Sequence, residues 1–363
     1  MNHATSPTGI FCDIFCVVID NYGDAAVCWR LARQLALEHG WQVRLWIDDP
    51  SPLYRLAPGF QNGPVKVGVW SDALDDPADV VIEAFGCELP ASYVAAMAKR
   101  PRPPVWLNLE YLSAEPWVAG CHGMTSPHPS LPLVKYFFFP GFEPGTGGLL
   151  RERDYEARRE AFDANVFRSE FGVPQRLPDE LTISLFSYPN AALPRLLDAW
   201  ASARQPVRLL IPGGTDAAFT KGNLSCHPLP FLTQLRYDEL LWTCDLNFVR
   251  GEDSFVRAQW AAKPFVWHTY PQANQVHLVK LRAFLGLAFT PQEETTALDS
   301  TNGTYTATTT TFWRAWNGDG ELDWSPFSAA LPALLQHARR WKSHLLETPD
   351  LAFGLVQFCR QRL

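Results

Sequence analysis

Two acidic side chains stand four residues apart, directly after an apolar run near the start of the chain. The segment reads Asp20-Asn21-Tyr22-Gly23-Asp24 and leads into a helix-like stretch. Open α/β sheets bind ligands at the carboxyl ends of their strands, and carboxylates there suit a cationic or proton-donating substrate. A carboxylate at a helix start is also a common cap. For Asp24 the chemical and the structural interpretation therefore both stay open.

A second candidate follows a strand-like segment that ends near residue 249 and includes Arg250, Gly251, Glu252, Asp253 and Ser254. A helix that begins here presents backbone amides, which form an anion site suited to a diphosphate. Gly251 permits the sharp turn, and the Ser254 hydroxyl can add a donor. Two acids beside a phosphate would repel it, so at least one should face another group. The alternatives are a capped helix with acidic first-turn residues and, for Arg250, a structural ion pair.

A third candidate is aromatic. Phe186 and Tyr188 stand at a strand end, and Phe231 could stack on a flat base while Gln234 reads its edge. With 23 Phe and 14 Trp in the chain, core packing explains most aromatic residues, so each is a weak signal alone. Gly213 gives a weaker phosphate-loop signal, for which a plain turn is the default interpretation. The nine His are dispersed and no HExxH or DxD motif occurs, so no metal site is expected.

The elements that must position these residues alternate between strand and helix. The first half predicts strands at residues 10–19, 42–47, 80–85 and 105–109, and helices at 25–39 and 91–99. A proline-bounded stretch, 173–178, reads as a linker, after which the alternation restarts with strands at 181–186, 207–211, 224–228, 246–249 and 264–267. This pattern predicts an α/β fold with two Rossmann-like domains, residues 1–175 and 176–345, facing a cleft.

Two further segments connect or close these domains. The charged stretch 149–171 is interpreted as a solvated connecting helix. Residues 327–363 read as two helices broken near Pro349. By fold analogy the last helix, about 346–363, crosses back to the first domain.

Composition narrows the class of function. The chain has 363 residues and a net charge of −7, which argues against nucleic acid as the main partner. No apolar run of transmembrane length and no secretion signal is visible. The eight cysteines lack metal-like spacing and fit reduced, mostly buried thiols. These features predict a cytoplasmic protein.

Several segments together resemble one family. They are Asp20 to Asp24, Cys-Trp-Arg-Leu-Ala-Arg-Gln-Leu at 28–35, Leu-Asn-Leu-Glu-Tyr-Leu-Ser at 107–113, Lys-Tyr-Phe-Phe-Phe-Pro at 135–140, Gly-Gly-Leu-Leu-Arg-Glu at 147–152, Phe-Val-Arg-Gly-Glu-Asp-Ser at 248–254 and Lys-Pro-Phe-Val-Trp-His at 263–268. In this order they are similar to the protein-arginine rhamnosyltransferases that modify bacterial translation elongation factor P. Tyr22 stands where Phe is common, and Ala26 where Gly is expected.

The resemblance implies a GT-B glycosyltransferase that inverts the anomeric centre and needs no metal or other cofactor. The donor would be dTDP-β-L-rhamnose and the acceptor an arginine guanidine of elongation factor P, with neither nucleic acid nor membrane as partner. The first domain would bind the acceptor and the second the nucleotide sugar.

Roles carried over by the resemblance fall into two groups. Asp20 would be the catalytic base and Asp24 would orient or support the acceptor, which would lie at Asp20, Asn21, Tyr22 and Asp24. Glu252 would contact the donor near its sugar and diphosphate. The remaining donor-binding residues would be Phe186, Tyr188, Gly213, Phe231, Gln234, Arg250, Gly251, Asp253 and Ser254.

Two alternatives remain at this stage. One is another GT-B glycosyltransferase, or a nucleotide-sugar epimerase, that acts on a small acceptor with the same two-domain architecture. The other is a protein that binds the translation factor without catalysis. The pair Asp20 and Asp24 together with Glu252 argue against pure binding, which has no need of those acids.

Overall fold

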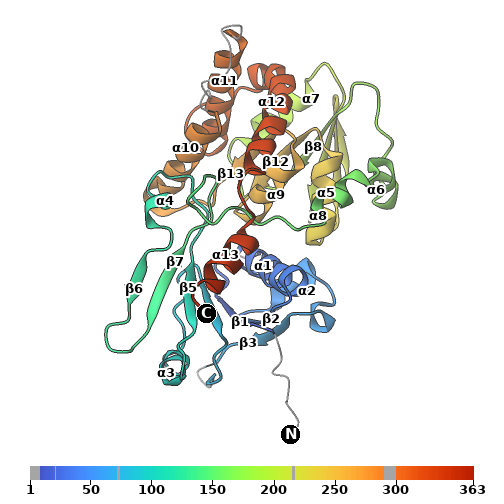
Figure 1. Ribbon diagram of the computed structural model, residues 1–363. Helices are drawn as coiled ribbons and strands as arrows, with labels where there is room; N and C mark the ends of the chain where they lie inside the picture. The colour runs from blue at the N-terminus through green and yellow to red at the C-terminus, as the bar shows by residue number, and fades with distance from the viewer. Residues whose placement is uncertain (1–8, 21, 72–73, 215–216, 290–299) are drawn as a thin grey trace. The chain divides into compact units, whose positions relative to one another are not determined.

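The computed structural model describes residues 9–20, 22–71, 74–214, 217–289 and 300–363 (Figure 1). The chain divides into two compact units, residues 1–153 with 348–363, and residues 154–347. Each unit is built around its own, largely parallel sheet. Within the described ranges, no helix is both long and apolar enough to cross a membrane. All eight cysteines are free thiols, and most of them are buried, as expected.

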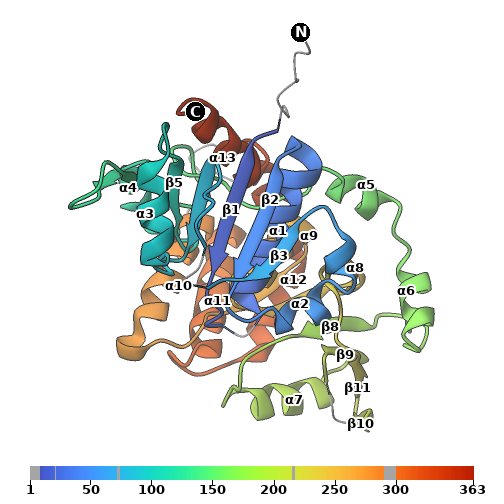
Figure 2. The ribbon, with the colours of Figure 1, turned by 90° about the horizontal axis from the view of Figure 1, so that it is seen from below.

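The sheet of the N-terminal unit has seven strands in the order β3-β2-β1-β4-β5-β7-β6. Figure 2 shows β1, β2 and β3 side by side. The pairs are parallel except β6 with β7, which is antiparallel. The strands are β1 (Phe11–Cys16), β2 (Gln42–Ile47), β3 (Lys66–Val69), β4 (Val80–Ala84), β5 (Val105–Leu109), β6 (Thr125–Pro127) and β7 (Val134–Phe138).

Strand burial explains which strands the sequence revealed. β4 and β5 are buried along their whole length, which gives the continuous apolar runs typical of central parallel strands. The edge strands β3 and β6 are short and partly exposed, so they carry no such signal and were not predicted. β1 ends at Cys16 rather than near residue 19, so residues 17–20 form a loop before the first helix.

The helices of this unit include the C-terminal one, as the sequence predicted. In Figure 1 the red helix α13 lies against the blue helix α1. Gln34 of α1 donates to the Asp350 carboxylate at 2.9 Å, and the Leu351 amide donates to the Leu149 carbonyl at 3.0 Å. Gly148 has a φ of 76°, and a Cβ there would lie 2.1 Å from the Pro349 carbonyl oxygen, so only glycine fits this crossing. The helices are α1 (Gly23–His39), α2 (Ser51–Leu56), η1 (Phe60–Asn62), α3 (Ala91–Lys99), α4 (Val118–Cys121) and α13 (Leu351–Arg360).

The C-terminal unit contains a six-stranded sheet in the order β10-β11-β9-β8-β12-β13. Its pairs are parallel except β10 with β11. The strands are β8 (Leu181–Leu185), β9 (Val207–Pro212), β10 (Phe219–Lys221), β11 (Leu224–Leu229), β12 (Leu246–Arg250) and β13 (Phe265–His268). The helices are α5 (Tyr155–Glu160), α6 (Ala164–Glu170), α7 (Leu193–Ala201), α8 (Gln234–Thr243), α9 (Asp253–Ala261), η2 (Ala273–Gln275), α10 (Val276–Phe289), α11 (Ser300–Trp316) and α12 (Trp324–Leu345).

The boundary between the units falls about twenty residues earlier than the expected one. Residues 149–171 do not form one solvated helix, because α5 and α6 both pack into the C-terminal unit. Tyr155 is fully buried and its hydroxyl accepts from the Trp242 indole at 2.8 Å. Arg168 is also buried and pairs with Glu180 at 3.0 Å. The expected linker at 173–178 therefore lies inside this unit.

Candidate active site

Asp20 lies in the loop between β1 and α1, at the carboxyl edge of the N-terminal sheet. Its side chain is partly exposed, and its carbonyl accepts from the Gly23 amide at 2.6 Å. A Cβ added to Gly23 would lie 2.9 Å from the Asp20 carboxylate oxygen Oδ2. The absence of a side chain at Gly23 thus lets the Asp20 carboxylate rest against the start of the helix.

Asp24 is buried, with 3% of its surface exposed, and its carboxylate accepts hydrogen bonds from the same loop. Its Oδ2 accepts from the amides of Ile19 and Asp20, both at 2.8 Å. Its Oδ1 accepts from the Tyr111 hydroxyl at 3.1 Å. Asp24 therefore reaches back from the helix to the preceding loop and holds the backbone of Asp20.

The other predicted residues of this segment have separate surroundings. Tyr22 is the residue before α1, and its hydroxyl accepts from the Arg55 guanidinium at 3.0 Å. Asn21 lies outside the described residues. Tyr111 was not among the predicted site residues, although it stands in the segment 107–113. Its contact with Asp24 joins residues 87 positions apart, and only the strand order β1-β4-β5 brings them together.

In the C-terminal unit, Arg250 packs against two of the predicted aromatic residues. Its guanidinium lies over the Phe186 ring at 4.3 Å and over the Tyr188 ring at 4.7 Å from the ring centres. Phe186 and Tyr188 follow β8, which neighbours β12, so the strand order makes this contact. The guanidinium also donates to the Ser187 carbonyl at 3.4 Å, and within the described part of the chain no carboxylate pairs with it. The structural ion pair considered for Arg250 is thus not found there, and its charge remains available to an anion.

The predicted anion site lies at the turn between β12 and α9. Gly251 has a φ of 64°, which favours glycine, and Glu252 precedes the helix without a capping hydrogen bond from its side chain. The first-turn amides of α9 therefore receive no cap from Glu252. The Ser254 hydroxyl differs from expectation, because it donates to the Arg250 carbonyl and accepts from the Arg250 amide at 3.1 Å. That hydroxyl fixes the turn rather than pointing a donor at a ligand.

The Asp253 carboxylate is turned away from the helix start into a buried ion-pair network. It accepts from Arg257 at 3.0 Å and from the Gln234 amide at 3.2 Å. Arg257 also donates to Asp238 at 2.8 Å. The repulsion expected between Asp253 and a bound phosphate is reduced, because Arg257 neutralises the Asp253 charge. Gln234, predicted to read a base edge, is 5% exposed, and its amide nitrogen donates to Asp253.

Phe231 and Gly213 lie together at the ends of β11 and β9. The Gly213 amide donates to the Pro230 carbonyl at 3.2 Å, and a Cβ on Gly213 would contact the partly exposed Phe231 ring at 3.8 Å. A partly exposed ring beside a glycine turn suits stacking on a flat base.

His268, at the end of β13, was missed as a neighbour of this region although it closes the segment 263–268. It pairs in register with Arg250 and is 6% exposed. Burial, and then the charge of Arg250, lowers the pKa of His268 to about 4. Its Nδ1 is buried and has no hydrogen-bond partner among the described residues. The imidazole is therefore neutral near pH 7.

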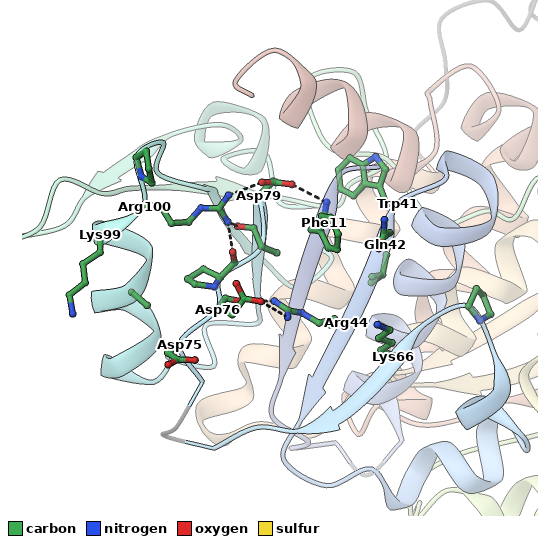
Figure 3. A pocket seen from close by; sticks show the side chains of 16 residues that line it. Phe11, Trp41, Gln42, Arg44, Lys66, Asp75, Asp76, Asp79, Lys99 and Arg100 are labelled. Carbon is green, nitrogen blue, oxygen red and sulfur yellow. Dashed lines mark hydrogen bonds and ion pairs between the residues drawn. The ribbon is translucent and has the colours of Figure 1, made fainter. Parts of the chain in front are cut away.

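A hollow of about 1000 Å³ lies elsewhere on the N-terminal unit (Figure 3). Phe11, Gln42 and Lys66, which begin β1, β2 and β3, line it, so it lies at the amino edge of the sheet, opposite Asp20. Arg44 pairs there with Asp76 at 3.4 Å, and Arg100 pairs with Asp79 at 2.8 Å. This hollow, although large, therefore does not lie at the predicted catalytic residues. Among the described residues no cluster of His, Cys, Asp and Glu is arranged to hold a metal ion.

Comparison with known proteins decides the family. Residues 12–360 match the family described as "Elongation-Factor P (EF-P) rhamnosyltransferase EarP". The chain belongs to this family. A protein-arginine rhamnosyltransferase of Pseudomonas putida is 47% identical over 97% of this chain and 99% of the relative. One of Pseudomonas aeruginosa is 46% identical, over 95% and 98%. This EarP-family chain is therefore an enzyme, a glycosyltransferase.

Solved structures give the fold of this family member. One described as "Structural basis for EarP-mediated arginine glycosylation of translation elongation factor EF-P" has a TM-score of 0.68 and 36% identity, covering 98% of this chain and 100% of that chain. CalG4, the calicheamicin glycosyltransferase, has a TM-score of 0.51 with 14% identity, covering 98% and 99%. The expected GT-B fold and the resemblance found in the sequence are both confirmed.

Proposed function

We propose that this enzyme transfers L-rhamnose from dTDP-β-L-rhamnose to an arginine guanidine of translation elongation factor P, with inversion and without a metal. The observation that carries the proposal is the family match over residues 12–360. A solved relative 36% identical to this chain is described as acting on that factor. Because translation factors work in the cytoplasm, the proposed acceptor also places the reaction there.

On the acceptor side, the partly exposed Asp20 serves as the base. A free guanidinium has a pKa above about 12, so a carboxylate cannot deprotonate it before the reaction begins. Asp20 instead orients the cation and accepts its proton as the nitrogen loses basicity during attack on C1. Asp24 supports this step by holding the Asp20 amide at 2.8 Å.

On the donor side, the bond between C1 and the diphosphate oxygen breaks and its electron pair stays on that oxygen. The amides of the first turn of α9 and the Arg250 guanidinium stabilise the resulting charge. Glu252, beside them, contacts the sugar or diphosphate. Phe231, with Phe186 and Tyr188, forms the thymidine site, and Gly213 forms the turn beside Phe231. Transfer requires both substrates to be bound at once.

The test is to mix the protein with elongation factor P and dTDP-rhamnose and to weigh the acceptor. A gain of one deoxyhexose on an arginine supports the proposal. An unchanged acceptor accompanied by donor hydrolysis contradicts it and favours another GT-B activity on a small acceptor.

The Asp20→Asn variant tests the assignment of the base. We expect transfer to fall about 100-fold or more, the range of general-base catalysis, while calorimetry shows unchanged dTDP binding. Asp75→Asn is the matched control, because Asp75 is an exposed acid at the other edge of the same sheet, and it should transfer normally. Full activity of Asp20→Asn would remove Asp20 from the mechanism.

A further inference from the structure

An aromatic pair stands beside the two aspartates at the carboxyl edge of the N-terminal sheet. Tyr111 follows β5 and Phe85 follows β4, and their rings stack with centres 4.2 Å apart and planes 10° apart. The Tyr111 hydroxyl donates to Asp24 Oδ1 at 3.1 Å. The stack therefore ends in a hydrogen bond to the carboxylate that holds the Asp20 loop.

Both loops that carry this pair are fixed by one buried side chain, Asn108 of β5. Its Oδ1 accepts from the Gly86 amide at 3.0 Å, and its Nδ2 donates to the Glu110 carboxylate. The Phe85 amide also donates to the Leu109 carbonyl at 2.7 Å. These hydrogen bonds fix the backbone of both loops and thereby the positions of the two rings.

Phe85 adopts a backbone conformation that bulky residues rarely take, with a φ of 59°. Such a conformation persists only where the surroundings determine it, and it is found most often at functional sites. Here the stack on Tyr111 and the hydrogen bond from the Phe85 amide to the Leu109 carbonyl hold this conformation.

We propose that Tyr111 is a positioning residue for the transfer reaction, which acts through Asp24 and is itself aligned by Phe85. This inference rests on the proposed function. The two amides of the Asp20 loop bind the same oxygen of Asp24, Oδ2, and these two hydrogen bonds do not by themselves fix the rotation of the carboxylate about that contact. The Tyr111 hydroxyl is the donor on the second oxygen, so it fixes the carboxylate plane and with it the Asp20 loop.

The Tyr111→Phe variant keeps the stacked ring and removes only the hydroxyl. We expect kcat for transfer to fall about 10- to 100-fold, because a small displacement of a catalytic group is enough for such a loss. The KM for elongation factor P and the dTDP affinity should change less than about twofold, since a residue that acts through Asp24 changes kcat and not substrate binding. Phe85→Leu, which keeps the hydroxyl but removes the stacking face, should lower kcat in the same direction and less strongly.

A matched control separates positioning from stability. Tyr93 lies in the same unit and donates its hydroxyl to another buried aspartate, Asp13, away from the Asp20 loop. We expect Tyr93→Phe to lower the melting temperature and leave kcat of the folded enzyme unchanged. A Tyr111→Phe variant that behaves in the same way would overturn the inference.

The decisive measurement is the effect of Tyr111→Phe in an Asp24→Asn background. If Tyr111 acts through Asp24, the added loss in kcat is less than about twofold there. An equal loss in both backgrounds, or a raised acceptor KM with unchanged kcat, shows direct contact with the acceptor and contradicts the proposal. The wild type in the same assay distinguishes the two claims: no transfer by the wild type defeats the proposed function and this inference together, whereas transfer unaffected by Tyr111→Phe defeats the inference alone.

Discussion

At the scale of single residues, the position of the Asp20 carboxylate depends on the absence of a side chain at Gly23. A methyl group at position 23 would meet the end of the Asp20 side chain at 2.9 Å rather than any backbone atom. The side chain can swing away at little cost, so the fold tolerates the change. The carboxylate, however, loses its place against the helix.

The Gly23→Ala variant should therefore lose activity without losing stability. We expect kcat to fall about 10- to 100-fold, as a displacement of about 1 Å would cause. The melting temperature should stay equal or rise slightly, because alanine costs less backbone entropy than glycine in a helix. Steady-state kinetics and a thermal melt of the same preparation check both parts. Unchanged kcat would show that Asp20 does not need this position.

Residue types predicted the acidic site, but their partners could not be read from the sequence. Asp13 and Asp24 differ from Asp20 in their burial and in their partners. Asp13 is fully buried and bound to Arg44 through both oxygens, at 2.6 and 2.7 Å, which makes it structural. The sequence marked Asp24 as either a cap or a chemical group, and the structure gives it a third task, holding Asp20. The Tyr111 contact depends on strand order, which residue spacing does not encode.

At the scale of elements, the carboxyl ends of β8 and β12 meet around Arg250. The alternation of strands and helices predicted that Phe186, Tyr188 and Arg250 each follow a strand. It did not predict that β8 and β12 are neighbours, which the strand order decides.

The boundary between the two units was expected at residue 175 because the proline-bounded stretch 173–178 was interpreted as a linker and the charged stretch 149–171 as a solvated connecting helix. The structure divides the chain after residue 153. Tyr155 and Arg168 from that stretch are buried, which a pattern of charges cannot reveal.

Arg250 provides the test at this scale. We expect Arg250→Gln to weaken dTDP binding about 10- to 100-fold and to leave thymidine binding within about twofold, because in the proposed function its charge acts on the diphosphate and not on the base. Calorimetry with the two ligands measures the difference. Arg204→Gln is the control, since Arg204 is exposed on the loop that enters β9 from the opposite edge. Equal losses for both ligands would indicate that Arg250 only supports the aromatic rings.

At the scale of the whole molecule, the buried His268 and the partly buried His337 link stability to pH. The pKa values of His268 and His337 are both lowered to about 4, chiefly by burial and then by a nearby arginine. Above pH 6.5 neither the native nor the unfolded state protonates them. Between pH 6.5 and 4 the unfolded state binds protons that the native state does not, so stability falls as the pH falls through this window.

His268 gives the sharper experiment because its Nδ1 lacks a partner among the described residues, so a phenylalanine loses no hydrogen bond at that atom. Its ring packs edge-on against Tyr188 at 5.4 Å and Trp316 at 5.7 Å, contacts that phenylalanine preserves. From a shift of 6.5 to about 4, this group costs about 2 kcal/mol of unfolding free energy at pH 5. The His268→Phe variant should therefore lose about 2 kcal/mol less than the wild type between pH 8 and pH 5 in urea unfolding. At pH 8 the two proteins should be nearly equal, which serves as the internal control. Parallel pH dependence of the two would mean that His268 is protonated in the native state.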